Sequence, residues 1–166
     1  MKTIAFFGHR IIYKAEEVYL RLLNIIEEKI SQGHLNFLIG RYGDFDNIAL
    51  KSLMECRKKI NKNIQITIVL TNYSVLKKDE FGNCGIDYYK NNGIDTMMYD
   101  IEEVYFKNKI NVSNRKMVDD SDVVICYVDN KRYNSGSKKA INYAQRQGKE
   151  VINLFMQEDR LFKLKD

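Results

Sequence analysis

The segment NRKMVDDSDVVICYV, residues 114–128, leads from a polar stretch containing Arg115 directly into an apolar, β-branched run. Such a run is typical of a buried strand. A small-residue turn, Ser135-Gly136-Ser137, follows it and offers free backbone N–H groups before the next helix. A fixed positive charge and backbone donors at the end of one strand are suited to binding phosphate or another anionic group.

Strands and helices are predicted to alternate along the whole chain. Strands are expected over residues 2–8, 35–40, 64–70, 95–99, 123–128 and 151–155. Helices are expected over residues 14–32, 44–61, 112–121 and 138–147, and a long loop or short excursion over 72–92. This alternation predicts the α/β class, a Rossmann-like three-layer sandwich whose mostly parallel sheet is covered on both faces.

The spacing of apolar residues predicts which helix faces point inward. In the helix over residues 44–61 the buried stripe is predicted to contain Phe45, Ala49, Leu53, Cys56 and Ile60. In the helix over residues 138–147 it is predicted to contain Ala140, Ile141 and Ala144.

The length and composition predict a single domain spanning residues 1–166. Hydrophobic residues make up 45% and charged residues 30% of the chain, a balance typical of globular proteins. No apolar run approaches the roughly 18 residues of a membrane span. The apolar run before Gly8 is too short for the core of a signal peptide, so we expect a cytoplasmic protein that binds no membrane.

The cysteines Cys56, Cys84 and Cys126 are widely spaced and form no CxxC pair. We therefore expect neither a disulfide framework nor a zinc site, and no motif points to another metal or to a cofactor. The net charge of +5 permits binding to nucleic acid, but the lysines are scattered and a solvated surface explains them better.

Ligands of a parallel α/β sheet bind outside the carboxyl ends of its strands. Gly8, His9 and Arg10 follow the first predicted strand. Gly8 lets the chain turn and approach a ligand closely, and Arg10 can pair with phosphate or carboxylate. His9 can donate to a ligand; the alternative is that His9 and Arg10 only brace the turn. The segment is not GxGxxG, which disfavours an ordinary NAD site.

The second predicted strand is followed by Gly40-Arg41-Tyr42-Gly43-Asp44-Phe45-Asp46. Two glycines ahead of a helix leave backbone N–H groups that can cradle a ligand. Asp46 is predicted to accept hydrogen bonds from ribose hydroxyls or a base, and Tyr42 can stack on a base. The alternative is that both acids serve the helix, Asp44 as its N-cap and Asp46 in its first turn.

A third group of candidates flanks the fifth predicted strand. Arg115, beside Asn114, is the strongest candidate for contacting an anion; the alternative is an ion pair with Asp119, Asp120 or Asp122. Ser135, Gly136 and Ser137 offer backbone and hydroxyl donors.

Two acids are weak candidates for catalysis. Asp46 or Glu103 could act as a general base or a nucleophile. For Glu103, an ordinary solvated acid is the favoured interpretation.

Together these segments resemble the SLOG superfamily of Rossmann-like nucleotide-ligand-binding proteins, in particular a small bacterial branch. The matching residues are Gly8-His9-Arg10, then Gly40, Gly43, Phe45 and Asp46, then Glu103, then Asn114 to Met117, then Ser121 to Ile125, then Gly148-Lys149 and the strand after it. The resemblance keeps its order over residues 2–155. It implies a parallel three-layer fold with a nucleotide-like small molecule at the strand ends, and assembly as a homo-oligomer.

Two departures from the family bear on function. Ser135 stands where the family has the first glycine of a Gly-Gly turn, which restricts the backbone near a phosphate. The related cytokinin-activating phosphoribohydrolases carry a catalytic Glu where this chain has Ala140. This chain is therefore not expected to run that reaction in the same way.

Three functions remain open at this point. The first is binding, or sensing, of a nucleotide or nucleoside-derived ligand. The second is hydrolysis or transfer at a nucleotide N-glycosidic bond, with Asp46 or Glu103 as base or nucleophile and Arg115 stabilising phosphate. The third, which is disfavoured, is DNA binding through basic clusters at residues 57–62, 131–139 and 160–165.

Overall fold

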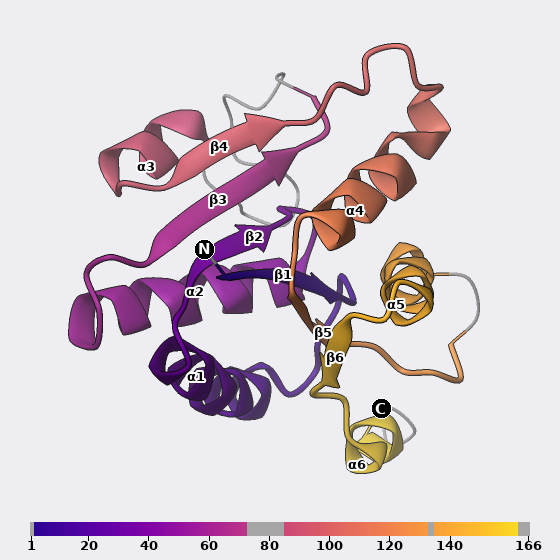
Figure 1. Cartoon of the computed structure of the whole chain (residues 1–166). Coiled ribbons are helices and arrows are strands. Elements are labelled where there is room, and N and C mark those ends of the chain that lie inside the picture. The colour runs from indigo at the N-terminus through magenta and orange to yellow at the C-terminus, as the bar shows by residue number, and fades with distance from the viewer. Residues whose placement is uncertain (1, 73–84, 133–134, 163–166) are drawn as a thin grey trace.

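The computed structural model of the chain describes residues 2–72, 85–132 and 135–162 (Figure 1). Within these residues six strands form one sheet: β1 (Lys2–Gly8), β2 (His34–Ile39), β3 (Gln65–Leu70), β4 (Asp95–Met98), β5 (Val123–Tyr127) and β6 (Glu150–Asn153). The helices are α1 (Ala15–Ser31), α2 (Asp44–Lys59), α3 (Ile86–Asn91), α4 (Lys109–Asp119), α5 (Gly136–Arg146) and α6 (Gln157–Phe162), with a 3-10 turn, η1 (Phe106–Asn108).

The sheet is parallel throughout, in the order β4-β3-β2-β1-β5-β6. Ile4 of β1 lies opposite Phe37 of β2 on one side and Val123 of β5 on the other. The chain adds strands outward from β1 to β4, then crosses over to β5, so the order reverses between β1 and β5. This Rossmann-like arrangement confirms the predicted fold class, and it directs attention to the carboxyl ends of these two strands.

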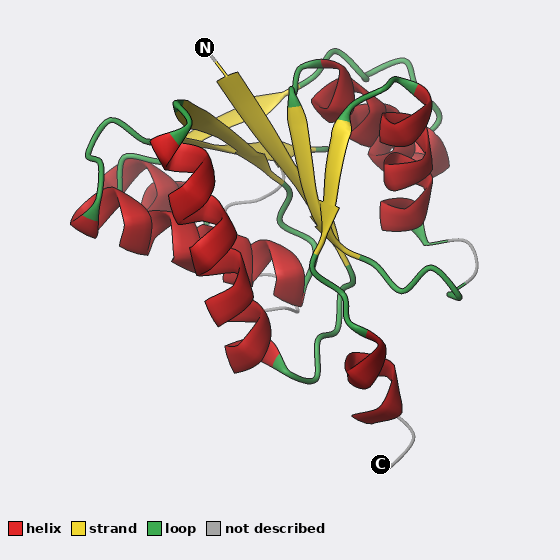
Figure 2. Cartoon of the chain, turned by 60° about the horizontal axis from the view of Figure 1, so that its bottom comes forward, coloured by secondary structure: helices red, strands yellow, loops and turns green. Residues whose placement is uncertain are grey.

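Helices cover both faces of the sheet (Figure 2). Alternate residues of β1 point to opposite faces, and each face has its own core. Ile4 and Phe6 join one core with α1 and α2, whereas Ala5 and Phe7 join the other with α4 and α5. Because both faces are buried, the central strands are almost continuously apolar.

The predicted core stripes hold with one exception. Ala140, Ile141 and Ala144 are buried on α5, and Phe45, Ala49, Leu53 and Cys56 are buried on α2. Ile60, in contrast, is 48% exposed. The helix ends at Lys59, so the helical spacing that placed Ile60 on the stripe no longer applies to it.

Two short helices differ from the sequence-based expectation. The sequence predicts a long loop or a short excursion over residues 72–92, without a defined helix; the described part contains α3, which buries Tyr89. Residues 73–84 lie outside the described residues. The chain also continues beyond β6 into α6, which no periodic pattern indicated. Both helices are six residues long, too short to form without tertiary contacts.

The described helices include none that is long and apolar enough to cross a membrane. Cys56 and Cys126 are buried free thiols. Cys84 lies outside the described residues.

Candidate functional site

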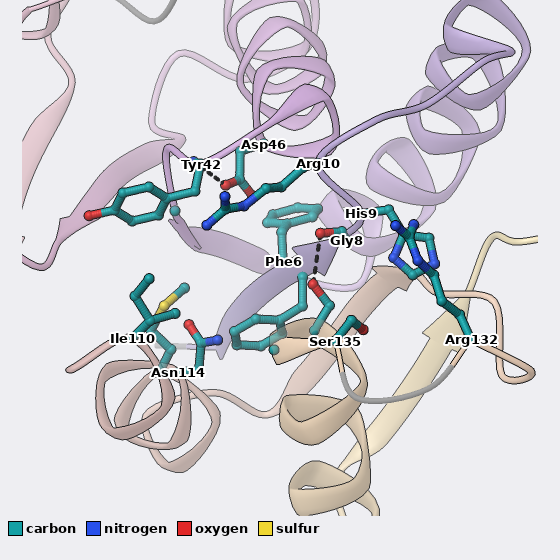
Figure 3. A pocket seen from close by; sticks show the side chains of 15 residues that line it. Phe6, Gly8, His9, Arg10, Tyr42, Asp46, Ile110, Asn114, Arg132 and Ser135 are labelled. Atoms are coloured by element: carbon teal, nitrogen blue, oxygen red, sulfur yellow. Dashed lines mark hydrogen bonds between the residues drawn. The ribbon is translucent and has the colours of Figure 1, made fainter. Parts of the chain in front are cut away.

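A cavity of about 310 Å³ lies at the carboxyl ends of the central strands (Figure 3). It is bounded by the loops after β1 and β2, by α4 and by the start of α5. Nine of the predicted ligand-binding residues line it: Gly8, His9, Arg10, Gly40, Asp46, Asn114, Ser135, Gly136 and Ser137. Segments separated by up to 129 positions therefore meet at one site, as when the Ser137 hydroxyl donates to the Gly8 carbonyl at 2.7 Å.

His9 braces the loops at the rim of the cavity. It is only 6% exposed, and its Nε2 accepts a hydrogen bond of 2.8 Å from the backbone N–H of Asp129. Its own backbone N–H donates to the Tyr127 carbonyl at 3.2 Å. Because Nε2 is an acceptor here, the hydrogen bond assigns the ring proton to Nδ1. The structure thus gives His9 the bracing role that the sequence had left as the alternative.

The loops after β1 and β2 are tied together at their backbones. The Asp44 N–H donates to the Arg10 carbonyl at 2.8 Å, and the Ile12 N–H donates to Asp44 Oδ2 at 2.8 Å. A Cβ atom on Gly43 would lie 2.4 Å from the Cα of Arg10. Gly43 is therefore needed where two loops approach each other, and it does not line the cavity.

The expected N-cap role of Asp44 is wrong. Gly43 occupies the N-cap position of α2, with no side-chain cap, and Asp44 is the first residue of the helix. Its carboxylate instead satisfies the Ile12 amide, 32 residues earlier in the chain. Sequence spacing alone could not reveal so distant a partner.

Asp46 supplies an unusual carboxyl group to the cavity wall. Its Oδ2 accepts a hydrogen bond of 2.8 Å from the Tyr42 amide. Burial raises the pKa of Asp46 to about 6, although the Tyr42 amide and the Arg10 guanidinium both act to lower it. Figure 3 shows the Arg10 side chain beside Asp46. A carboxyl group with this pKa can accept a hydrogen bond or exchange a proton near neutral pH.

Gly40 makes room for that carboxyl group. A Cβ atom at position 40 would come within 3.0 Å of Asp46 Oδ2. This close approach accounts for a glycine at position 40 without a ligand, because the Cβ atom of any other residue would crowd the Asp46 carboxylate.

The start of α5 supplies hydrogen-bond donors to the opposite side of the cavity. Ser135 is the N-cap, and its hydroxyl accepts from the Lys138 amide at 3.0 Å. The first N–H groups of a helix have no partner within the helix. The amides of Gly136 and Ser137, both on the cavity wall, are accordingly placed to receive an anionic group.

Several lining residues were not singled out as ligand contacts from the sequence. Phe6, Phe7, Ile110 and Met117 give the cavity an apolar portion, and Arg132 adds a cation. From the sequence, these apolar residues cannot be distinguished from core residues, because the end of a strand or one face of a helix can line both the core and a cavity. Arg132 belongs to the basic cluster at residues 131–139, which the sequence relates only to DNA binding.

Tyr42 also lines the cavity, as its predicted role requires. Its hydroxyl shares a short hydrogen bond with the Thr71 hydroxyl, which holds the ring between the β2 and β3 loops.

Besides Gly43, three predicted site residues lie elsewhere. Arg41 is 4% exposed, and its guanidinium carbon lies 6.0 Å from the centre of the Tyr89 ring. Glu103 is exposed between β4 and α4 and does not line the cavity. Arg115 lines a neighbouring cavity, where its guanidinium carbon lies 5.4 Å from the centre of the Tyr143 ring.

The acids proposed as alternative partners of Arg115 have other contacts. Asp119 accepts from the Tyr143 hydroxyl at 2.8 Å, Asp120 from the Tyr99 hydroxyl at 2.6 Å, and Asp122 from the Thr3 amide at 2.8 Å. Within the described residues Arg115 forms no ion pair with any of them.

Several residues of the basic clusters considered for DNA binding form hydrogen bonds or ion pairs within the protein. Arg57 donates to the carbonyls of Asn92 and Gly93, Lys59 pairs with Glu55, and Arg160 pairs with Asp129. Residue Tyr133 and the side chain of Phe162 lie outside the described part of the chain.

Replacing Asp46 by asparagine is expected to stabilise the protein at neutral pH. With its pKa raised from 3.8 to about 6, the folded state holds this proton more tightly than the unfolded state. The free energy of unfolding of the native protein should then fall as pH rises through the interval between these values. Asp46→Asn removes this effect, so we expect a gain of about 1–3 kcal/mol at about pH 7.5 and little difference at about pH 4.

Urea denaturation at both pH values measures the effect of Asp46→Asn. Glu103→Gln, at an exposed acid outside the cavity, is the matched control and should leave stability unchanged. A less stable Asp46→Asn variant at neutral pH would show that the attraction of Arg10 outweighs burial.

The described residues contain no group of three His, Cys, Asp or Glu side chains placed to hold a metal ion. No family model matches the chain. A comparison with curated proteins likewise finds no match.

Proposed function

We propose that the cavity binds a nucleotide or nucleoside-derived ligand, and that the chain is a SLOG-like domain. The observation that carries the proposal is that backbone amides, an arginine, an acid and apolar side chains line a single cavity. This cavity lies where the strand order reverses, between β1 and β5. Parallel α/β sheets bind their ligands at this location. The resemblance in sequence motifs, three of which contribute residues to this cavity, supports the same conclusion.

The chemistry of the walls matches the parts of a nucleotide. The amides of Gly136 and Ser137 suit a phosphate group, and Arg10, which lies beside Asp46 on the facing wall, adds a cation that can pair with an anionic group. Asp46, in the first turn of α2, lies across the cavity from Ser135, the N-cap of α5, and suits the hydroxyls of a ribose. Phe7 and Met117 provide apolar surface against which a base can pack.

Binding can be tested by thermal shift and calorimetry with AMP, ADP and ADP-ribose at millimolar concentration. We expect at least one of them to raise the Tm of the native protein, and Arg10→Met to weaken its binding about tenfold by removing a charge-assisted contact. Glu103→Gln should bind as the native protein does. If none of the three compounds raises the Tm, the proposal is wrong.

Cleavage of an N-glycosidic bond is the second candidate. The raised pKa of Asp46 favours it, because an acid that titrates near neutral pH can act as a general base or acid. Incubation with nucleoside monophosphates should then release free base and ribose 5-phosphate, and Asp46→Asn should abolish the release. Binding without any turnover would leave ligand binding as the function.

A further inference from the structure

A second cavity, of about 320 Å³, lies between α4 and α5. It shares two lining residues, Asn114 and Gly136, with the cavity described above, so the two border each other. From α4 it takes Asn111 and Arg115, and from α5 it takes Lys139, Asn142 and Arg146. Spacings of three and four residues place each set on one face of its helix.

The lining of this second cavity is strongly basic. Arg115, Lys139 and Arg146 contribute three cations, and the asparagines contribute amides; no acid is among the residues that line it. None of the three cations forms an ion pair within the part of the chain that the structure describes. The guanidinium carbon of Arg115 lies 5.4 Å from the centre of the Tyr143 ring, and the Tyr143 hydroxyl donates a hydrogen bond to Asp119. Three like charges converging without acids favour an anionic occupant.

We propose that the cavity between α4 and α5 is a subsite for a second, distal phosphate group of the ligand. The inference rests on the proposed nucleotide binding in the first cavity. It specifies the ligand class further: a nucleotide-derived molecule with phosphates at two separated places, such as a linear dinucleotide with a 5′-phosphate. Gly136 lines both cavities and adds no side chain where they meet; the nearest atom to a Cβ there would be Asn111 Oδ1 at 3.8 Å.

The test compares AMP with 5′-phosphoadenylyl-adenosine, which carries a second phosphate, by calorimetry. The native protein should bind the dinucleotide at least about tenfold more tightly than AMP, because charge-assisted contacts to the second phosphate are gained. In a Lys139→Gln/Arg146→Gln variant the ratio of the two affinities should fall close to one.

A variant with the same net charge provides the control. Lys58→Gln/Lys62→Gln removes two exposed cations at and beyond the end of α2, on the opposite side of the sheet. It should keep the native affinity ratio. A ratio near one in the native protein, or an equal loss in both double variants, would overturn the proposal.

A separate arm uses pyrophosphate alone and follows the backbone amides of α4 and α5 by NMR. We expect pyrophosphate to shift these amides in the native protein and not in Lys139→Gln/Arg146→Gln. If neither AMP nor the dinucleotide binds, the proposed function fails. The pyrophosphate experiment still decides whether the cavity between α4 and α5 binds an anion. Absence of the shifts would overturn the subsite whatever the first cavity binds.

Discussion

Replacing Arg21 by methionine is expected to lower the free energy of unfolding by about 3 kcal/mol, because it leaves a buried carboxylate without its main partner. Arg21, on α1, donates to both oxygens of Asp159 at 2.8 and 3.0 Å and to the Leu154 carbonyl at 3.0 Å. The Asp159 side chain is 1% exposed. The pair attaches α6 to the body of the domain.

The effect of Arg21→Met should depend on pH, because it depends on the ionisation of Asp159. Burial acts to raise the pKa of Asp159, but hydrogen bonds from Arg21, the Met156 amide and Tyr127 outweigh it and hold the pKa below its ordinary value. Because the pKa of Asp159 is lowered in the folded state, its ionised carboxylate stabilises the protein at pH values above the ordinary pKa of an aspartate. This stabilisation is lost as the pH falls through the lowered pKa. The difference between native protein and variant should therefore be largest at neutral pH and shrink in acid.

Urea denaturation and thermal melting measure the effect, and a fall in Tm of roughly 10 °C is expected. Glu17→Gln is the control, since Glu17 is an exposed partner of Arg21 and should contribute less than about 0.5 kcal/mol. Arg21→Met/Asp159→Asn should be less destabilised than Arg21→Met, because the unpaired charge is gone. An Arg21→Met variant as stable as the native protein would contradict this account.

Replacing Gly8 by alanine is expected to cost about 2–3 kcal/mol through overpacking. A Cβ at Gly8 would lie 2.2 Å from Cγ and 2.5 Å from Cβ of Phe45. Phe45 is fully buried, and its ring stacks on Tyr127 at 6.2 Å between centres. It cannot rotate away, so β1 and α2 must separate, and we expect the cavity to lose ligand affinity as well.

Gly136→Ala is the matched control for stability. It lies on the same cavity, but its Cβ would make only an ordinary contact, and alanine favours a helix over glycine. Its urea midpoint should match or exceed that of the native protein. If the urea midpoint of Gly8→Ala equals that of the native protein, the close approach of β1 to Phe45 does not constrain the fold.

Local patterns accounted for most of the fold. The strands were recognisable because both faces of the sheet are buried, which makes segments such as Ile4–Phe7 continuously apolar. The inward face of α5 followed from the spacing of Ala140, Ile141 and Ala144. The helices α3 and α6 were not predictable in this way, since the burial of Tyr89 and the pairing of Asp159 with Arg21 depend on distant parts of the chain.

The candidate site was predictable as a set of loops and much less as a set of side chains. The sequence by itself determined which loops meet, because alternating strands and right-handed crossovers put every strand-to-helix turn at one rim. Only the tertiary structure decided that Asp46 faces the cavity, that Arg41 lies against Tyr89 and that Arg115 belongs to the neighbouring cavity. The direction of a loop side chain follows no periodicity; it depends on backbone contacts between segments far apart in the chain, such as those of Arg10 with Gly43 and Asp44.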